Sequence, residues 1–265
     1  MRLMIGAMQY QYITTSVDDN VQIITINRPE KMNALNAQLL QEVKSAVEAG
    51  NSNDDVHGII ITGSGEKAFA AGADIAEFKN FSVAEGQKLS ADGHEVMNTV
   101  ERSPKLVIAA VNGFALGGGC ELAMACHLRV ASPNARFGQP EVNLGLIPGY
   151  GGTQRMVQLI GKGKAMELLT TADMVGADEA KSLGLVNHVV EQNELISFAT
   201  SIIQKVAKKS PRAIGETIAC VNAFFDQDAD GMRTEITKFG ECFQTTDFVE
   251  GTSAFLEKRK TNFRK

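Results

Sequence analysis

Cysteine is scarce in this sequence, and its spacing gives it no evident structural role. The four cysteines are Cys120, Cys126, Cys220 and Cys242, and none of them forms a C-x-x-C motif. A chain of 265 residues is long enough to build a core without disulfide bridges. We therefore expect reduced, mostly buried thiols, as in an intracellular protein.

A clustered set of metal ligands is also absent. The four histidines are scattered along the chain, and His94-Glu95 has no second histidine at Asn98, where a zinc-binding helix would carry it. We therefore expect no metal site and no histidine-based catalytic triad.

Neither a large net charge nor a long apolar run is present. The formal net charge of −5 provides no basic field of the kind that holds a nucleic-acid backbone. No apolar stretch approaches the roughly 20 residues that cross a bilayer. Residues 1–8 form a short apolar run that lacks a signal-peptide cleavage site. These absences favour a cytoplasmic protein that binds neither nucleic acid nor membrane.

The sequence does contain alternating strand, loop and helix patterns. The β-branched run Val21–Asn27 predicts a strand, and the near-continuous apolar runs at 58–62 and 105–111 predict strands covered on both faces. After the first strand, apolar residues recur at helical spacing until Gly50, which we expect to end a helix. These apolar residues are Leu35, Leu39, Val43, Ala46 and Val47.

The last third of the chain is predicted to be mostly helical. Helical patterns cover 164–171, 177–183, 195–208, 211–225 and 233–243. Ser210-Pro211 supplies an N-cap followed by proline at the first helical position. A sheet-rich first part joined to these helices predicts an α/β fold with sites on the loops that leave the strands.

Two glycine-bearing or small-residue loops are candidate ligand sites. The first is Ala68–Ile75, and the second is Asn112–Cys126, which contains Gly117-Gly118-Gly119 at the expected start of a helix. Free backbone N–H groups and the positive end of a helix dipole would meet there. Tight packing of a helix on a sheet explains three glycines equally well. The spacing is not a dinucleotide-binding fingerprint, because its third glycine would fall at Leu122.

Two glutamates lie near these loops and could share acid and base duties. Glu121 falls in the first turn of the expected helix, and Glu141 precedes the glycine-rich segment Leu146–Thr153. By position alone, a charge at a helix N-terminus for Glu121 and a solvated loop residue for Glu141 are the favoured explanations, since surface carboxylates are common. Tyr150, in that same segment, either shapes a pocket or packs in the core.

Several separated motifs together resemble the crotonase family, and most closely its enoyl-CoA hydratases. The motifs occur in the family's order over nearly the whole chain. They include Ala68–Ile75, Val107–Gly113, Leu116–Glu121, Phe137–Glu141 and Pro148–Arg155, with further agreement at Asn27–Pro29, Asn33–Asn36, Gly184–Val186 and Ser253–Lys260.

The resemblance implies a fold and an active site. The implied fold is a crotonase-like spiral of ββα units over residues 1–200, followed by a helical trimerisation region over 201–265. The implied oxyanion hole consists of the N–H groups of Ala73 and Gly118. Glu121 would then orient and activate water, and Glu141 would give a proton to the α-carbon of a 2-enoyl-CoA. No cofactor is implied, since coenzyme A is part of the substrate.

The resemblance also implies contacts with coenzyme A and an oligomer. The binding residues would be main-chain groups around Met32 and Ala34, together with Ala71, Asp74 and Ile75. Phe255 and Lys258 would come from a neighbouring subunit of a homotrimer or hexamer. For Lys258, a role as one charge of a solvated helix end remains open.

Three other functions remain open at this stage. Relatives with the same scaffold include enoyl-CoA isomerases and other enzymes of thioester-enolate chemistry, but these usually lack one or both glutamates. Some relatives bind RNA through a lysine-rich early helix, whereas residues 34–49 here contain only Lys44. A non-catalytic acyl-CoA-binding protein would not be expected to keep Glu121 and Glu141.

Overall fold

The computed structural model describes residues 10–264, and the predicted absence of a signal peptide lies outside this range. The strands form two sheets whose spatial orders are β1-β2-β3-β5-β7-β10 and β4-β6-β8-β9. Neighbouring strands are parallel except in the pairs β1/β2 and β8/β9. The strands are β1 (Ile13–Asp18), β2 (Val21–Ile26), β3 (Gly58–Gly63), β4 (Ala68–Ala71), β5 (Leu106–Val111), β6 (Phe114–Leu116), β7 (Leu128–Ala131), β8 (Arg136–Gly138), β9 (Val175–Gly176) and β10 (His188–Val189).

Helices follow successive strand pairs and then dominate the end of the chain. The helices are α1 (Ala37–Ser52), α2 (Val83–Glu101), α3 (Gly118–Ala125), α4 (Gly152–Ile160), α5 (Lys162–Thr171), α6 (Ala177–Leu183), α7 (Leu195–Val206), α8 (Pro211–Ala223), α9 (Gly231–Cys242) and α10 (Thr246–Leu256). Short 3₁₀ turns are η1 (Pro29–Lys31), η2 (Ile75–Glu77), η3 (Glu141–Leu144) and η4 (Gln192–Glu194).

The chain winds as a spiral because consecutive strands join different sheets. The pairs β3/β4, β5/β6 and β7/β8 each give one strand to the six-stranded sheet and the next to the four-stranded sheet. Helices α2 and α3 follow the first two of these pairs. The predicted α/β spiral of ββα units is therefore confirmed.

The inner strands β3 and β5 of the six-stranded sheet are buried on both faces, as their apolar runs predict, whereas the edge strand β1 is mostly exposed. Ile59 and Ile61 of β3 join the main core together with residues of α1, α2 and α3. Ile60, on the opposite face, packs in a second cluster with Ala199 and Ile203 of α7. Strands covered on both faces carry continuous apolar sequence because successive side chains point to opposite sides.

Two details of helix α1 differ from the prediction. Gly50 does not end the helix, which continues to Ser52. A Cβ at Gly50 would lie 2.1 Å from Oε1 of Gln22, so the glycine permits close packing of α1 on β2. Leu35 precedes the helix, because Asn36 is the N-cap and its side chain accepts a hydrogen bond from the N–H of Leu39 at 2.7 Å.

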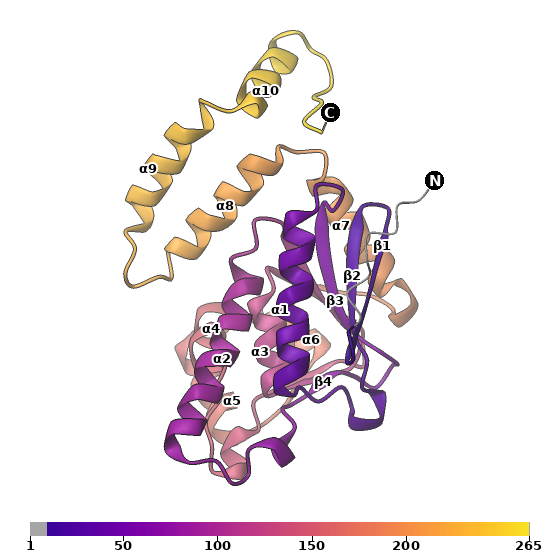
Figure 1. The fold of residues 1–265 in the computed structure, drawn as a ribbon, viewed down its shortest axis with the longest axis vertical. Coiled ribbons are helices and arrows are strands. Elements are labelled where there is room, and N and C mark those ends of the chain that lie inside the picture. The colour runs from indigo at the N-terminus through magenta and orange to yellow at the C-terminus, as the bar shows by residue number, and fades with distance from the viewer. Residues whose placement is uncertain (1–9, 265) are drawn as a thin grey trace.

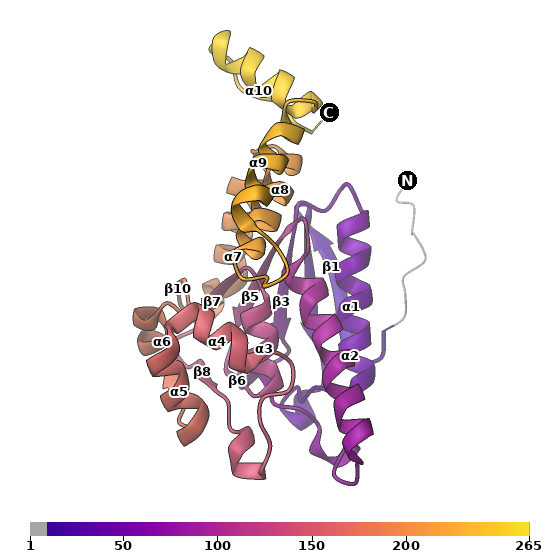
Figure 2. The same cartoon turned by 90° about the vertical axis from the view of Figure 1, so that its left-hand side faces the viewer.

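The helical C-terminal region projects from the body as an arm. In Figure 1, α8, α9 and α10 form the orange and yellow part above the sheets, and Figure 2 shows the same arm from the side. The five helices predicted in this third of the chain all occur, with ends within three residues of those expected. The division between residues 200 and 201 stays a prediction, and it falls within α7.

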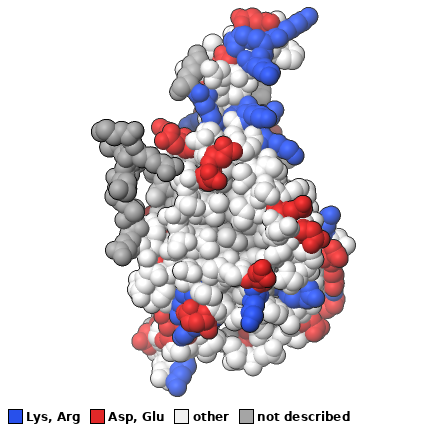
Figure 3. Space-filling view, turned by 90° about the vertical axis from the view of Figure 1, so that its right-hand side faces the viewer, with Lys and Arg blue, Asp and Glu red and all other residues white. Residues whose placement is uncertain are grey.

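Surface charge is mixed on the face shown in Figure 3. Basic and acidic side chains lie near each other both at the lower edge and around the arm, and a wide uncharged area lies between these two regions. A nucleic-acid backbone would meet acidic as well as basic groups along this face.

Candidate active site

A cavity of ≈ 1070 Å³ brings the two small-residue loops and both predicted glutamates together. Glu121 and Glu141 line it beside the main chain of Ala71–Ala73 and Gly117-Gly118. Apolar side chains form much of the remaining wall, and they include Ile75, Phe78, Phe81, Val83, Leu89, Leu144, Leu146 and Ile147. A mostly apolar cavity with a few convergent polar groups is the usual form of a small-molecule site.

The position of Ala73 is set by a bridge to the segment before α1. Leu35 donates from its N–H to the carbonyl of Gly72 at 2.9 Å, and the N–H of Asp74 donates to the carbonyl of Leu35 at 2.7 Å. Because the neighbours of Ala73 make this parallel bridge, the N–H of Ala73 itself faces away from Leu35. Within residues 10–264, no hydrogen bond uses the N–H of Ala73.

Each of the three consecutive glycines has its own structural role. Gly117 has a φ of 48°, and a Cβ there would lie 2.6 Å from Oε1 of Glu141. Gly118 is the first residue of α3, so its N–H has no intrahelical acceptor. A Cβ at Gly119 would lie 2.0 Å from the carbonyl oxygen of Ala70. Close helix packing and a cavity-lining residue whose N–H has no intrahelical acceptor therefore occur together in one segment.

Glu121 is buried and held by the backbone of the loop that faces it. Its side chain is 1% exposed, and Oε1 accepts hydrogen bonds from the N–H of Tyr150 at 2.8 Å and of Gly152 at 2.7 Å. Burial raises the pKa of Glu121 to about 7, although the two backbone hydrogen bonds oppose this shift; the charge of Glu141 adds to it. Such a carboxyl can exchange a proton near neutral pH.

Glu141 lies at the start of η3 and is supported by a residue that sequence reasoning missed. Burial raises the pKa of this carboxyl above its ordinary value. Gln139 is fully buried, and with its amide oriented to donate, its nitrogen lies 3.0 and 3.1 Å from the two oxygens of Glu141. The available signal was the polar residue inside the apolar motif Phe137–Glu141.

Tyr150 both packs and lines the cavity, so the two roles considered for it are compatible. Its ring lies against the backbone of Gly93 and close to Gly118, where added Cβ atoms would lie 2.1 and 3.3 Å away. The side chain borders the cavity although it is only 6% exposed.

Of the coenzyme A residues predicted in the first part of the chain, Ala71 and Ile75 line this cavity, whereas Met32, Ala34 and Asp74 do not. The N–H of Ala71 donates to the carbonyl of Met32 at 3.0 Å. The carbonyl of Ala34 accepts a hydrogen bond from Arg28 at 2.7 Å. Met32 is therefore joined directly to the cavity wall through Ala71.

The carboxylate of Asp74 is already engaged within the chain. It forms ion pairs with Lys31 and Arg28, each at 3.0 Å. The hydrogen bonds from Lys31 and Arg28 lower the pKa of Asp74 below its ordinary value. Arg28 and Lys31 were missed as site residues, and the signal was their position in the motifs that flank Met32.

Phe255 and Lys258 do not reach this cavity within one chain. Phe255 is 83% exposed near the end of α10, which Figure 1 places at the far end of the arm, and Lys258 follows that helix. Neither residue lines the cavity. Their predicted contribution from a neighbouring subunit stays a prediction.

Neither a cluster of metal ligands nor a membrane-spanning helix occurs in the described part of the chain. Between residues 10 and 264, no group of three or more His, Cys, Asp or Glu side chains could hold a metal ion. In the same range, no helix has the length and apolar character needed to cross a bilayer.

A spiral α/β fold with the buried carboxyl of Glu121 and the half-buried carboxyl of Glu141 beside free backbone N–H groups defines the class of this protein as an enzyme. The family model "Enoyl-CoA hydratase/isomerase" matches residues 16–265. The chain belongs to the enoyl-CoA hydratase/isomerase family, which confirms the predicted crotonase resemblance.

The relatives agree with the predicted subgroup. A crotonyl-CoA hydratase of Syntrophomonas wolfei is 49% identical over 257 residues, which cover 97% of this chain and 99% of the relative. A short-chain-enoyl-CoA hydratase of Clostridium acetobutylicum is 46% identical, with 96% and 97% coverage. The crystal structure of an enoyl-CoA hydratase from Bacillus anthracis is 37% identical, with a TM-score of 0.88 over 96% of this chain and 99% of that chain.

Proposed function

We propose that this protein is an enoyl-CoA hydratase that adds water across the 2,3 double bond of a 2-enoyl-CoA and forms a 3-hydroxyacyl-CoA. The observation that carries this proposal is the meeting of Glu121 and Glu141 in one cavity beside the N–H groups of Ala73 and Gly118. The hydratase names of relatives that share 46–49% of the sequence support it.

The N–H groups of Ala73 and Gly118 form the oxyanion hole in this proposal. Attack of water on the β-carbon moves negative charge onto the thioester oxygen as an enolate. Fixed donors at that oxygen stabilise the charge, and one such donor typically supplies about 3 to 4 kcal/mol. The dipole of α3, which begins at Gly118, acts in the same direction.

The two glutamates complete the reaction as base and acid. The Glu121 carboxylate takes a proton from water as the water oxygen bonds to the β-carbon. The Glu141 carboxylic acid gives its proton to the α-carbon as the enolate returns to a thioester. Both carboxyls have a raised pKa, which suits a pair that holds one proton between them.

Binding of coenzyme A involves two subunits in this proposal. Met32, Ala34, Ala71, Asp74 and Ile75 contact it from one chain, while Phe255 and Lys258 reach it from another. The enzyme is then a homotrimer or hexamer, needs no metal or further cofactor and works in the cytoplasm. Support for assembly comes from large apolar side chains exposed on the arm, namely Phe224, Met232, Ile236, Phe239, Phe255 and Leu256.

The direct test is the loss of enoyl absorbance when purified protein is added to crotonyl-CoA. Glu121→Gln and Glu141→Gln should each lower kcat by about 100-fold or more, because each removes one proton-transfer group. Glu95→Gln is the matched control, since Glu95 is exposed on α2, where it pairs with Lys44. Absence of hydration with short, longer and branched enoyl-CoAs would reject the proposal, and double-bond migration instead would identify an isomerase.

A further inference from the structure

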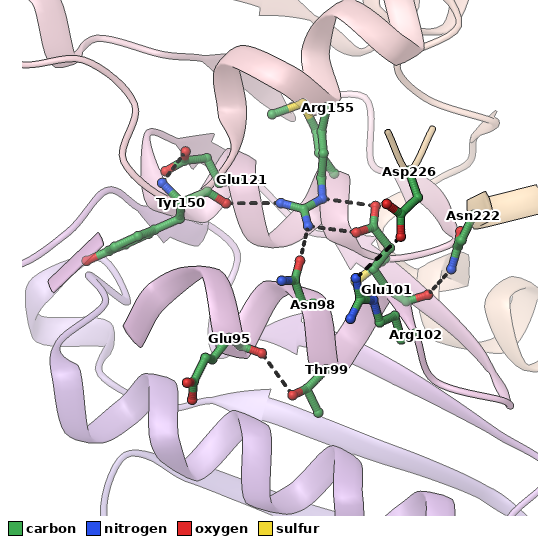
Figure 4. Close-up of polar contacts among 12 residues, drawn as sticks. Glu95, Asn98, Thr99, Glu101, Arg102, Glu121, Tyr150, Arg155, Asn222 and Asp226 are labelled. Atoms are coloured by element: carbon green, nitrogen blue, oxygen red, sulfur yellow. Dashed lines mark hydrogen bonds and ion pairs between the residues drawn. The ribbon is translucent and has the colours of Figure 1, made fainter. Parts of the chain in front are cut away.

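Arg155 of α4 forms a four-bond network beside the active site (Figure 4). Its Nε and one terminal nitrogen donate to the two carboxylate oxygens of Glu101 at 3.0 and 2.7 Å. The same terminal nitrogen donates to Asn98 at 3.0 Å, and the other donates to the carbonyl of Tyr150 at 3.0 Å. The Arg155 side chain is 8% exposed, and Glu101 supplies the carboxylate that pairs with its charge.

The peptide groups that Arg155 holds are part of the turn that binds Glu121. Arg155 binds the carbonyl of Tyr150, while the N–H groups of Tyr150 and Gly152 bind Oε1 of Glu121. Between them, Gly151 has a φ of 102°, and a Cβ there would lie 2.3 Å from a terminal nitrogen of Arg155. The turn is therefore shaped to fit the guanidinium on one side and the carboxylate on the other.

The network continues into the C-terminal arm. The backbone carbonyl of Glu101, at the end of α2, accepts hydrogen bonds from the side chain of Asn222 at 2.7 Å and from Nε2 of His127 at 2.9 Å. Asn222 belongs to α8, the first helix of the arm. The residue that anchors Arg155 is thus fixed by two other elements.

We propose that Arg155, oriented by Glu101, is a positioning residue that fixes the Tyr150–Gly152 turn and thereby aims the Glu121 carboxylate at the water nucleophile. The Arg155–Glu101 ion pair, in which the side chains are 8% and 29% exposed, adds little net stability, because loss of hydration and screening by solvent offset the attraction of the charges. Its multidentate geometry, in contrast, restricts the turn strongly. This inference rests on the proposed hydratase function.

The charged and titratable groups around Glu121 influence its pKa, and therefore the pH at which it ionises. They are Glu141 from η3, Arg155 from α4, Tyr150 from the loop and Cys120 from α3, with His94 of α2 on the same cavity. The bonds from Gly152 and Tyr150 and the charge of Arg155 all lower the pKa of Glu121 against the larger effect of burial. Loosening the turn should therefore raise this pKa.

The experiment compares Arg155→Lys and Glu101→Gln with wild type in crotonyl-CoA hydration over a pH series. Lysine at position 155 cannot make the four hydrogen bonds of Arg155. Glutamine at position 101 lacks the negative charge and one of the two acceptor oxygens of Glu101. We expect kcat to fall by about 10- to 100-fold with KM changed less than about 3-fold, since a misaimed group affects chemistry more than binding. The acid limb of kcat/KM should move to higher pH, because Glu121 must be ionised to take the water proton.

Asp92→Asn is the matched control for Glu101→Gln, because it removes an exposed carboxylate from α2, the helix that also carries Glu101. It should keep the wild-type kcat and acid limb. Variants that melt at lower temperature but keep the wild-type kcat and acid limb would overturn the inference and assign the network to stability alone.

A second readout separates this inference from the proposed function. The carboxyl of Glu121 can be followed by 13C NMR of labelled glutamate, as the signal that disappears in Glu121→Gln. Its titration midpoint should rise in Glu101→Gln even if wild type hydrates no enoyl-CoA, a result that would reject only the proposed function. An unchanged midpoint would overturn the positioning role.

Discussion

Glu121 combines deep burial with two backbone hydrogen bonds, and the balance between them makes its charge depend on pH. Burial raises the pKa to about 7, so the folded protein binds this proton more tightly than the unfolded chain does. The resulting contribution to stability is complete at low pH and is lost as the pH rises through about 7. Near and above neutral pH, the buried Glu121 therefore lowers the free energy of unfolding, while its raised pKa allows the carboxyl to exchange a proton.

Glu121→Gln should increase stability in alkaline solution. Glutamine stays neutral and keeps an oxygen that can accept from Tyr150 and Gly152. Relative to wild type, the variant should gain roughly 1 to 3 kcal/mol at about pH 9 and close to nothing at about pH 4. Denaturant unfolding at both pH values measures this, and a gain of the same size at both would contradict the assigned pKa.

Gly117 supplies a second prediction at the residue scale. Its φ of 48° is unfavourable for alanine, and the added Cβ would also press on Oε1 of Glu141. Gly117→Ala should therefore lower kcat by about 10-fold or more through displacement of Glu141.

Gly65→Ala is the control for Gly117→Ala. Gly65 has a φ of 75°, but a Cβ there would meet nothing within 4 Å. The Gly65→Ala variant should therefore be less stable than wild type, because alanine is strained at this φ, but should keep the wild-type kcat. Equal losses of kcat in the two variants would show that the clash with Glu141 is unimportant.

At the scale of elements, α7 is the helix that closes the outer face of the six-stranded sheet. Ile203 is fully buried there, and its side chain lies within 2.7 Å of the position of a Cβ on Gly58. The glycine at the start of β3 thus lets the helix lie directly on the strand. This contact depends on residues 145 positions apart in the sequence, from 58 to 203.

Ile203→Ala should destabilise the fold by about 2 to 5 kcal/mol, because it removes buried apolar atoms and leaves a cavity between α7 and β3. Lys205→Ala, at an exposed position of the same helix, should change stability by less than about 0.5 kcal/mol. The free energy of unfolding from urea titration compares them. A loss below about 1 kcal/mol for Ile203→Ala would mean that α7 packs loosely.

At the scale of the whole molecule, the arm exposes a set of apolar side chains that a lone chain would leave in water. Ile236 and Phe239 of α9 are 73% and 68% exposed, and Phe224 of α8 is 75% exposed. Exposed apolar groups of this size usually mark a protein interface. The network from Asn222 to Arg155 would then connect that interface with the loop that holds Glu121.

Sedimentation should give a particle of three or six chains of 28.5 kDa each. Ile236→Asp should shift it toward the monomer, because a charge at an apolar contact costs several kcal/mol unless it is paired. Val17→Asp is the control, since Val17 is also exposed but lies on β1, away from the arm. A wild-type protein that sediments as a monomer would reject the trimer and hexamer together.

The sequence determined the elements whose patterns are local. Continuous apolar runs predicted β3 and β5, helical spacing with the Ser210-Pro211 cap predicted α8, and family motifs identified the two glutamates. Helix α2 was not predicted, although Ser82 and Glu85 form a capping box at its start. These features follow from side chains that act within a few residues of one another.

Only the tertiary structure decided how distant segments meet. Gly50 looked like a helix end, but its role is to let α1 approach Gln22 of β2. Arg155 looked like one residue of a motif, and only the fold brings it to Glu101, 54 positions away. Burial, hydrogen-bond partners and pKa shifts depend on these long-range contacts. The sequence therefore identified the reactive carboxyls, whereas the fold alone created the surroundings that tune them.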